Sequence, residues 1–383
     1  MEPYHQNMNQ IRLSLVYEGR LGSSRADSTY VLENAECFSE ICQVRILVSR
    51  RNGWEIPLTI RDKFEVIEVG TSFNPKNIFQ SVFGQLRFSW NVRKLIVSGA
   101  TCPEVFLFHD WWPTQLMRFF KKTRRNKLIY LEVHNQIPLN IFGRLFFRHI
   151  DLFIATNEFK SKELQAVFSN KVIVEKNCVR LSRYKNLYTK VGLLNKPNQY
   201  TYSKRKVIGY TGSLGSEKNP YLFFETIKLL PQYDFLFVGK VPSSFKRTAD
   251  ALPNLYQLGT LDRNDVPRFQ ISCDLLLVTL DPSNEVSRKY TSTMKLLEYI
   301  AACRPIVAPK LPSILELLDI TEFYSYSADD PYDCANAIES AFMDLSENPR
   351  LPNPSRLPQY SWESRNERIL LEASQQLISI GQF

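Results

Sequence analysis

The chain has little glycine, few histidines and no long apolar run: of its 383 residues, 14 are glycine and 4 are histidine. Collagen-like and disordered compositions are excluded, because 44% of the residues are hydrophobic and 23% are charged. No stretch reaches the ~18 apolar residues of a membrane-spanning helix. The first ten residues lack the apolar segment of a signal peptide. We therefore expect a cytoplasmic, globular protein.

Motifs for metal and nucleophile chemistry are also missing. The seven cysteines are odd in number and form no C-x-x-C pair, so we expect reduced thiols and not disulfides or a zinc site. H-E-x-x-H, G-x-S-x-G and D-x-D do not occur. The sequence thus predicts neither a metal site nor a cofactor.

Acidic residues are scarce in the first half of the chain. The formal net charge is +9 overall. Residues 1–200 hold 29 basic and 17 acidic side chains, giving +12, whereas residues 201–383 hold 19 and 22, giving −3. This split indicates two domains that face different partners, although an imbalance without function is the plain alternative.

Short apolar runs alternate with amphipathic segments along the whole chain, which predicts an α/β fold. Strands are expected near 11–17, 43–49, 105–108, 128–133, 151–155 and 172–175, and again near 207–210, 235–238, 255–258, 275–279 and 305–308. A polar stretch at 187–205 without periodicity predicts a linker between the two series. Two doubly wound, Rossmann-like domains follow, with ligands expected beyond the carboxyl ends of the strands.

One candidate phosphate site lies between a predicted strand and a predicted helix. Gly212 and Gly215 allow backbone N–H groups to approach an anion, and Lys218 adds a full charge. Asn219-Pro220 predicts the start of the following helix, whose dipole favours a diphosphate. An ordinary strand-to-helix turn explains the same residues equally well.

A second candidate site begins the helix predicted near 292–302. Ser292 and Thr293 offer hydroxyl and N–H groups to an anion. Glu298 is the only acid in this apolar helix and needs a partner, because a lone buried carboxylate is costly. Ribose hydroxyls would serve, and so would a salt bridge to Lys295.

Two of the four histidines, His109 and His134, each follow a predicted strand directly. A neutral imidazole at a strand end can hydrogen-bond a sugar hydroxyl or a leaving oxygen. A purely structural role for each histidine stays open.

A basic and aromatic segment, 115–127, can lie on an anionic bilayer or contact nucleic-acid phosphates. A solvated helix face is the alternative. The docking candidates are Phe119, Phe120, Lys121, Lys122, Arg124 and Arg125.

The second half resembles GT-B fold glycosyltransferases of the family-4-like group, also called glycosyl transferases group 1. The matching runs occur in family order over residues 206–318, and the closing segment Tyr360-Ser361-Trp362-Glu363 fits as well. The runs are Gly209-Tyr210-Thr211-Gly212-Ser213 with Lys218-Asn219, Phe237-Val238-Gly239, Leu258-Gly259, Cys273-Asp274-Leu275-Leu276-Leu277-Val278, and Met294-Lys295-Leu296-Leu297-Glu298-Tyr299-Ile300-Ala301 followed by Arg304-Pro305-Ile306-Val307-Ala308.

The resemblance implies an acceptor-side domain at 1–200, a nucleotide-sugar-binding domain at 206–361 and a terminal helix at 362–383 that packs toward the first domain. It implies that His134 and Lys218 are catalytic, and that the loop after the first strand, with His109, borders the acceptor. The implied donor-binding residues are Gly212, Ser213, Lys218, Gly239, Ser292, Thr293, Lys295 and Glu298, and the implied acceptor-side residues are Glu18, Gly19, Gly22 and His109.

One position departs from the family pattern. Relatives often carry a glutamate eight residues before the one matched by Glu298, and here that position is Tyr290. The contact with the donor sugar that this glutamate usually makes is therefore not assigned.

The expected activity is transfer of a sugar from a nucleotide-sugar to a glycan or lipid-linked acceptor in cell-surface polysaccharide or glycoconjugate synthesis. The resemblance implies a hexosyltransferase that retains the anomeric configuration and needs no metal. We expect no nucleic-acid partner, and docking of the basic half at the inner face of an anionic membrane is a further hypothesis. A UDP-sugar 2-epimerase of the same fold and a non-enzymatic RNA- or membrane-binding protein are the alternatives.

Overall fold

The computed structural model divides the chain into two compact units. Unit 1 comprises Met1–Lys176 and Trp362–Phe383, and unit 2 comprises Asn177–Ser361. Each unit is described by itself below. The structure describes residues 8–23, 25–51, 53–70, 78–97, 102–114, 126–134, 137–168, 171–184, 205–285, 287–288, 294–317, 321–345, 347 and 350–382.

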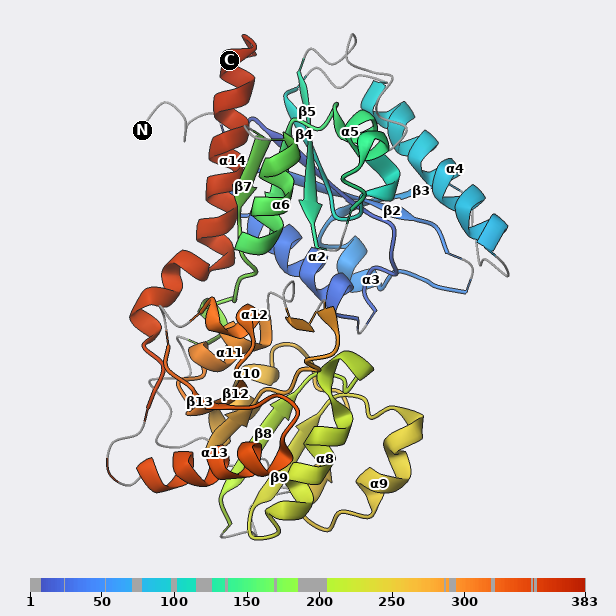
Figure 1. Ribbon diagram of the computed structural model, residues 1–383. Coiled ribbons are helices and arrows are strands. Elements are labelled where there is room, and N and C mark those ends of the chain that lie inside the picture. Colours follow the sequence, from blue (N-terminus) through green and yellow to red (C-terminus); the bar gives the residue numbers. More distant parts are fainter. Residues whose placement is uncertain are drawn as a thin grey trace. The chain divides into compact units, whose positions relative to one another are not determined.

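Unit 1 is built on a parallel sheet of seven strands in the order β3-β2-β1-β4-β5-β6-β7 (Figure 1). The order reverses between β1 and β4, where the chain crosses from one half of the sheet to the other. The strands are β1 (Arg12–Tyr17), β2 (Gln43–Ser49), β3 (Glu65–Val69), β4 (Glu104–Phe108), β5 (Lys127–Val133), β6 (Leu152–Ala155) and β7 (Val172–Val174).

Helices cover both faces of this sheet. One apolar cluster joins α2 (Ala26–Phe38) and α14 (Trp362–Ser379) to one face, through residues such as Val31, Tyr130 and Leu370. A second cluster joins α4 (Ile78–Val97), α5 (Ile141–Phe147) and α6 (Glu158–Phe168) to the other face. The short α3 (Leu58–Arg61) precedes β3. The last helix of the chain is thus part of the first unit.

Unit 2 repeats this architecture with a parallel sheet of six strands in the order β10-β9-β8-β11-β12-β13. Its strands are β8 (Val207–Thr211), β9 (Asp234–Val238), β10 (Leu255–Gln257), β11 (Leu275–Leu277), β12 (Ile306–Pro309) and β13 (Tyr324–Tyr326). The helical elements are η4 (Ser216–Lys218), α8 (Pro220–Leu229), η5 (Ser243–Phe245), α9 (Lys246–Asp250), α10 (Val266–Ser272), α11 (Met294–Ala301), α12 (Pro312–Leu315), α13 (Pro331–Asp344) and η7 (Pro354–Tyr360). Helices α8, α9 and α13 pack on one face of the sheet, and α10, α11 and α12 pack on the other.

The predicted fold class is confirmed: both sheets are parallel and doubly wound. Strands β3 and β13 and several helices, among them α2, α4, α6 and α10, were absent from the sequence prediction. In β3 two glutamates interrupt the apolar pattern, and α4 carries apolar residues on two opposite sides, which hides its period. The predicted linker, 187–205, lies outside the described residues except for its last position. Among the described helices none is long and apolar enough to span a bilayer.

Candidate functional site

The strand orders place one switch point in each unit, between β1 and β4 and between β8 and β11. Ligands of open α/β sheets bind beyond the carboxyl ends of the strands at such points. The residues of interest are therefore those that follow these strands. In unit 2 they include the loop that begins at Gly212, and in unit 1 they include Glu18 and His109.

The loops after β8 and β9 approach each other through bare backbone. Gly212 has a φ of +110° and Gly239 a φ of +147°, which L side chains rarely adopt. A Cβ atom on Gly239 would lie 2.3 Å from the carbonyl oxygen of Gly212. The Gly212 N–H donates to Val238 and the Gly239 N–H donates to Gly259. Two glycines thus keep this edge of unit 2 open, with Ser213 exposed beside it.

Two lysines meet at this loop. The Lys295 Nζ atom is buried and makes no hydrogen bond to any described residue. It lies 3.7 Å from the centre of the Tyr210 ring, and a Cβ on Gly212 would lie 3.4 Å from it. Burial, and then the nearby charge of Lys218, lower the pKa of Lys295 well below its ordinary value. Burial also lowers the pKa of Lys218. An anion bound here would relieve both effects, since it pairs with the charged forms.

Glu298 follows Lys295 on α11 and is held by an amide. Gln270 of α10 donates its Nε2 hydrogens to Glu298 Oε2 at 3.3 Å and to Thr211 Oγ1 at 3.2 Å. Its Oε1 accepts from the Tyr184 hydroxyl at 2.7 Å. Tyr299 in turn accepts the Thr211 N–H at 2.9 Å. The half-buried carboxylate is therefore oriented beside the end of β8.

Sequence analysis identified Lys218, Lys295, Glu298 and the glycines, but it missed Gln270. This side chain is fully buried and polar, and it lies in α10, a helix that was not predicted from the sequence. A buried glutamine surrounded by apolar residues was the signal that could have found it. The predicted Ser292 and Thr293, and the exceptional Tyr290, lie outside the described residues.

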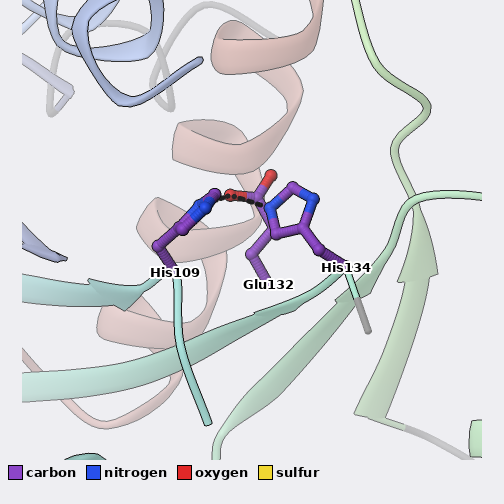
Figure 2. A group of neighbouring side chains, drawn as sticks. All are labelled: His109, Glu132 and His134. Atoms are coloured by element: carbon purple, nitrogen blue, oxygen red, sulfur yellow. Dashed lines mark ion pairs between the residues drawn. The ribbon is translucent and has the colours of Figure 1, made fainter. Parts of the chain in front are cut away.

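In unit 1, His109 and His134 flank a carboxylate that was not predicted (Figure 2). Glu132 is in β5, and its Oε2 lies 3.3 Å from His134 Nε2 and 3.8 Å from His109 Nδ1. The two imidazole rings are 4.3 Å apart between centroids. Alternate residues of β5 face opposite sides of the sheet, so Glu132 shares the side of Leu128 and Tyr130, against α2 and α14.

Arg365 completes this group from the terminal helix. Its guanidinium donates to Glu132 Oε1, and the Tyr30 hydroxyl of α2 donates to the same oxygen. Both charged side chains are buried, with Arg365 0% and Glu132 2% exposed. The Tyr30 and Trp362 rings pack against the guanidinium. One carboxylate thus joins a strand, two helices and both histidines.

The charges of this group follow from its contacts. Burial alone would raise the pKa of Glu132, but Arg365 and the two histidines hold it well below its ordinary value. Burial opposes the charge on His109, yet Glu132, Asp110 and Asp27 outweigh it and raise the His109 pKa. Burial and the neighbouring His109 lower the pKa of His134. His134 is therefore the imidazole that stays neutral.

The same three side chains offer metal-ligating atoms within 4.8 Å of one another, and no other such group occurs among the described residues. Arg365 already supplies a full positive charge to the carboxylate. A divalent ion would add to that charge in a buried setting, where like charges repel strongly. We therefore interpret the group as an ion-pair network that orients His134.

The loop after β1 is shaped by residues from the segment after β2. Arg51 donates to the Glu18 carbonyl at 2.9 Å, and Trp54 donates to the Leu21 carbonyl at 2.9 Å. Gly22 has a φ of +82° and leaves no room for a Cβ atom beside Pro57. A Cβ atom on the other predicted glycine, Gly19, would lie 2.1 Å from the Tyr17 hydroxyl oxygen.

Glu18 faces another carboxylate. The backbone N–H of Glu18 donates to Asp110 Oδ2, with 3.4 Å between nitrogen and oxygen. Asp110 directly follows His109 in the chain. Burial, followed by the charge of Asp110, raises the pKa of Glu18 to about 7, and Arg51 at 3.7 Å opposes the rise only in part. The loop after β1 therefore gains and loses a proton near neutral pH. The predicted docking residues Phe119–Arg125 lie outside the described part of the chain.

The chain is similar to known proteins in sequence over unit 2 and in fold over nearly its whole length. Residues 205–344 match the family model described as Glycosyl transferases group 1. The Anabaena protein HepE in complex with UDP-glucose is 14% identical, with 96% of this chain and 98% of that chain covered and a TM-score of 0.65. Residues 205–344 thus match a family of glycosyltransferases, and the chain as a whole has the GT-B fold. The matched residues include the Gly212 loop, both lysines and Glu298.

Two further solved structures share this fold. Sucrose-phosphate synthase from Thermosynechococcus elongatus is 14% identical, covering 96% of this chain and 99% of its own, with a TM-score of 0.71. The lipopolysaccharide outer core galactosyltransferase WaaB is 12% identical, with 96% and 99% covered and a TM-score of 0.61. No curated protein matches the chain.

Replacement of Arg365 by Met is expected to destabilise unit 1 by about 3–5 kcal/mol, because it leaves Glu132 buried without its cation. The double variant Glu132→Gln/Arg365→Met should recover part of this loss. Arg50→Met is the control, since the Arg50 side chain is 64% exposed and its partner Glu68 is 27% exposed. Its loss should stay below about 1 kcal/mol. Urea unfolding measures all three, and equal losses for the two single variants would contradict the assignment.

Glu18 is expected to make stability depend on pH. Its folded pKa of about 7 lies above the ordinary value of 4.5, so the folded state holds the proton through that interval. The free energy of unfolding contributed by Glu18 therefore falls as pH rises from 4.5 to 7, by about 2–3 kcal/mol. Glu18→Gln should remove this fall, and Glu55→Gln, at an exposed position, should keep it. Parallel curves for wild type and Glu18→Gln between pH 4.5 and 8 would refute the shift.

Proposed function

We propose that this protein is a glycosyltransferase that moves a hexosyl group from a nucleotide-sugar to a glycan or lipid-linked acceptor, with retention of configuration and without a metal. The observation that carries the donor assignment is the pair Lys218 and Lys295 at the open Gly212 loop. Lys295 is a buried cation-forming group whose charge no described side chain pairs by hydrogen bond. A diphosphate supplies the missing negative charge.

The proposed chemistry uses fixed electrostatics. Negative charge develops on the diphosphate as its bond to the anomeric carbon breaks. Lys218, Lys295 and the backbone N–H of Ser213 lie where such charge can be stabilised, and burial strengthens the interaction. Glu298, oriented by Gln270, is the proposed partner of the ribose hydroxyls.

Unit 1 supplies the proposed sugar- and acceptor-side groups. His134 stays neutral with its buried Nε2 atom facing Glu132, so its Nδ1 atom can accept a hydrogen bond from a hydroxyl. We assign it to the transferred sugar, as the family resemblance implies. The loop from Glu18 to Gly22 is the proposed border of the acceptor.

The names of similar proteins guide the choice of donor and acceptor. HepE is described in complexes with UDP-glucose and with UDP, and WaaB is described as a lipopolysaccharide outer core galactosyltransferase. We therefore propose a UDP-hexose as the first donor to test and a cell-surface glycan or its lipid-linked precursor as the acceptor. Because a lipid-linked acceptor is anchored in a bilayer, we also propose that the enzyme acts at an anionic membrane surface.

Donor binding should depend on three side chains of unit 2. Lys218→Ala, Lys295→Met and Glu298→Ala should each weaken binding of the preferred nucleoside diphosphate, among UDP, GDP and ADP, by at least about tenfold, since each loses a charged hydrogen bond. Titration calorimetry measures the affinity. Lys228→Ala is the control, because Lys228 lies in the last turn of α8 and pairs with Glu225. Wild-type affinity in all three variants would sink the donor assignment.

Transfer should not require a divalent ion, because the lysines supply the positive charge that a metal would otherwise bring. Dialysis against EDTA is expected to leave the transfer rate within about twofold, given charge stabilisation by fixed groups. NMR of the anomeric proton of the product reads the configuration in the same assay. Loss of activity that Mg²⁺ or Mn²⁺ restores would overturn metal independence, and an inverted product would overturn retention.

A further inference from the structure

Helix α4 has two apolar stripes, and only one of them belongs to the core. Phe88, Val92 and Ile96 are buried against the sheet of unit 1. Phe83 and Trp90 are 64% and 47% exposed, and Leu86 and Val97 are also exposed. Two residues along an α-helix turn it by about 200°, so Trp90 points away from the sheet that Phe88 and Val92 contact. A surface helix in a globular protein usually has a polar outer face.

The outer stripe is bordered by basic residues and has no acid. Arg87 and Lys94 are exposed along one side of it, and Arg93 packs 4.5 Å from the centre of the Trp90 ring on the other. No aspartate or glutamate occurs anywhere between Ile78 and Val97. Aromatic residues on one face with Lys and Arg beside them are typical of helices that lie in a membrane interface.

Helix α5 extends the pattern on the same side of the sheet. Its inner residue Phe147 joins the same core cluster as Phe88 of α4, so both helices turn their outer faces away from that sheet face (Figure 1). On the outer face Ile141 is 74% and Leu145 is 47% exposed. Arg144 and Arg148 are exposed between and after them, and no acid lies between Ile141 and Arg148.

We propose that the outer faces of α4 and α5, here called the α4–α5 face, dock on the surface of an anionic lipid bilayer, with Phe83 and Trp90 inserted among the acyl chains. The exposed apolar stripe favours an apolar partner, and the surrounding cations favour a negative one. A bilayer with anionic headgroups offers both. The proposal deepens the membrane location of the proposed function and names the surface responsible.

Charge argues against a second copy of the chain on this face, and the exposed apolar residues argue against a nucleic acid. A symmetric dimer through this face would bring the same cations of two copies together, and like charges across an interface oppose association. A nucleic acid would match the cations but would leave the exposed aliphatic stripe of Leu86, Val97, Ile141 and Leu145 in water. Both remain distinct outcomes of the test.

Co-sedimentation of the full chain with lipid vesicles tests the proposal. Binding should be strong to phosphatidylcholine vesicles that contain phosphatidylglycerol and weak to phosphatidylcholine alone. Phe83→Ser/Trp90→Ser should lower the partition coefficient at least about tenfold, because large apolar side chains leave the bilayer. Arg87→Glu/Lys94→Glu should do the same and remove the preference for anionic lipid.

Matched controls use unit 2. Tyr221→Ser/Met343→Ser removes equally exposed apolar side chains, and Arg247→Glu/Arg268→Glu reverses two exposed cations. Both should bind vesicles like wild type. Nucleotide affinity is measured separately in each variant without lipid, so failure of donor binding and failure of membrane docking are read independently.

Three results would overturn the proposal. One is equal binding of wild type and Phe83→Ser/Trp90→Ser to anionic vesicles. Another is a dimer, seen by light scattering, that the same substitutions dissociate while vesicles are not bound. The third is binding to a single-stranded RNA that Arg87→Glu/Lys94→Glu abolishes, with no binding to vesicles.

Discussion

The ion pair between Glu132 and Arg365 is the interaction on which unit 1 depends. A carboxylate in the middle of a buried sheet is tolerated only with a cation in direct contact, and removal of either charge leaves the other unpaired. The pair joins β5 to the last helix of the chain, and Tyr30 adds α2 through the same oxygen. The second carboxylate oxygen faces both histidines. Glu132 therefore both stabilises the fold of this unit and orients its two candidate histidines.

Unit 2 differs from unit 1 in that one of its buried cationic groups has no carboxylate partner within hydrogen-bond distance among the described residues. In unit 1 the buried charges are balanced from within by Glu132 and Arg365. In unit 2 the Lys295 ammonium group has the Tyr210 ring beneath it and a second lysine nearby, and no described carboxylate bonds to it. Backbone at Gly212 and Gly239 leaves the approach open. A diphosphate would supply the missing negative charge, and this difference is why we propose unit 2 as the donor-binding unit.

The sequence predicted what depends on local pattern. Buried parallel strands are continuous apolar runs, and most of them were predicted. The glycines of the Gly212 loop and the Asn219 cap are local signals as well. Contacts between distant positions were not predictable in this way. Glu132 and Arg365 are separated by 233 positions, and Gln270 reaches Glu298 from another helix. A single acid within the apolar run 128–133 was nevertheless a visible sign that a buried cation had to come from elsewhere. Helix α4 was not predicted because apolar residues on both of its sides hide the helical period of the sequence.

The order of segments along the chain sets the order in which the two units can be completed during synthesis. Unit 2 is continuous, from Asn177 to Ser361, whereas unit 1 needs Trp362–Phe383 as well as the first part of the chain. The whole of unit 2 therefore leaves the ribosome before Arg365 does. Until then Glu132 has no guanidinium partner, and α2 lacks the helix that packs beside it. The sheet of unit 1 is completed by residues that are made after the whole of unit 2. A chain truncated before Trp362 would therefore contain every described strand of both sheets and lack the Arg365 charge that stabilises the first sheet.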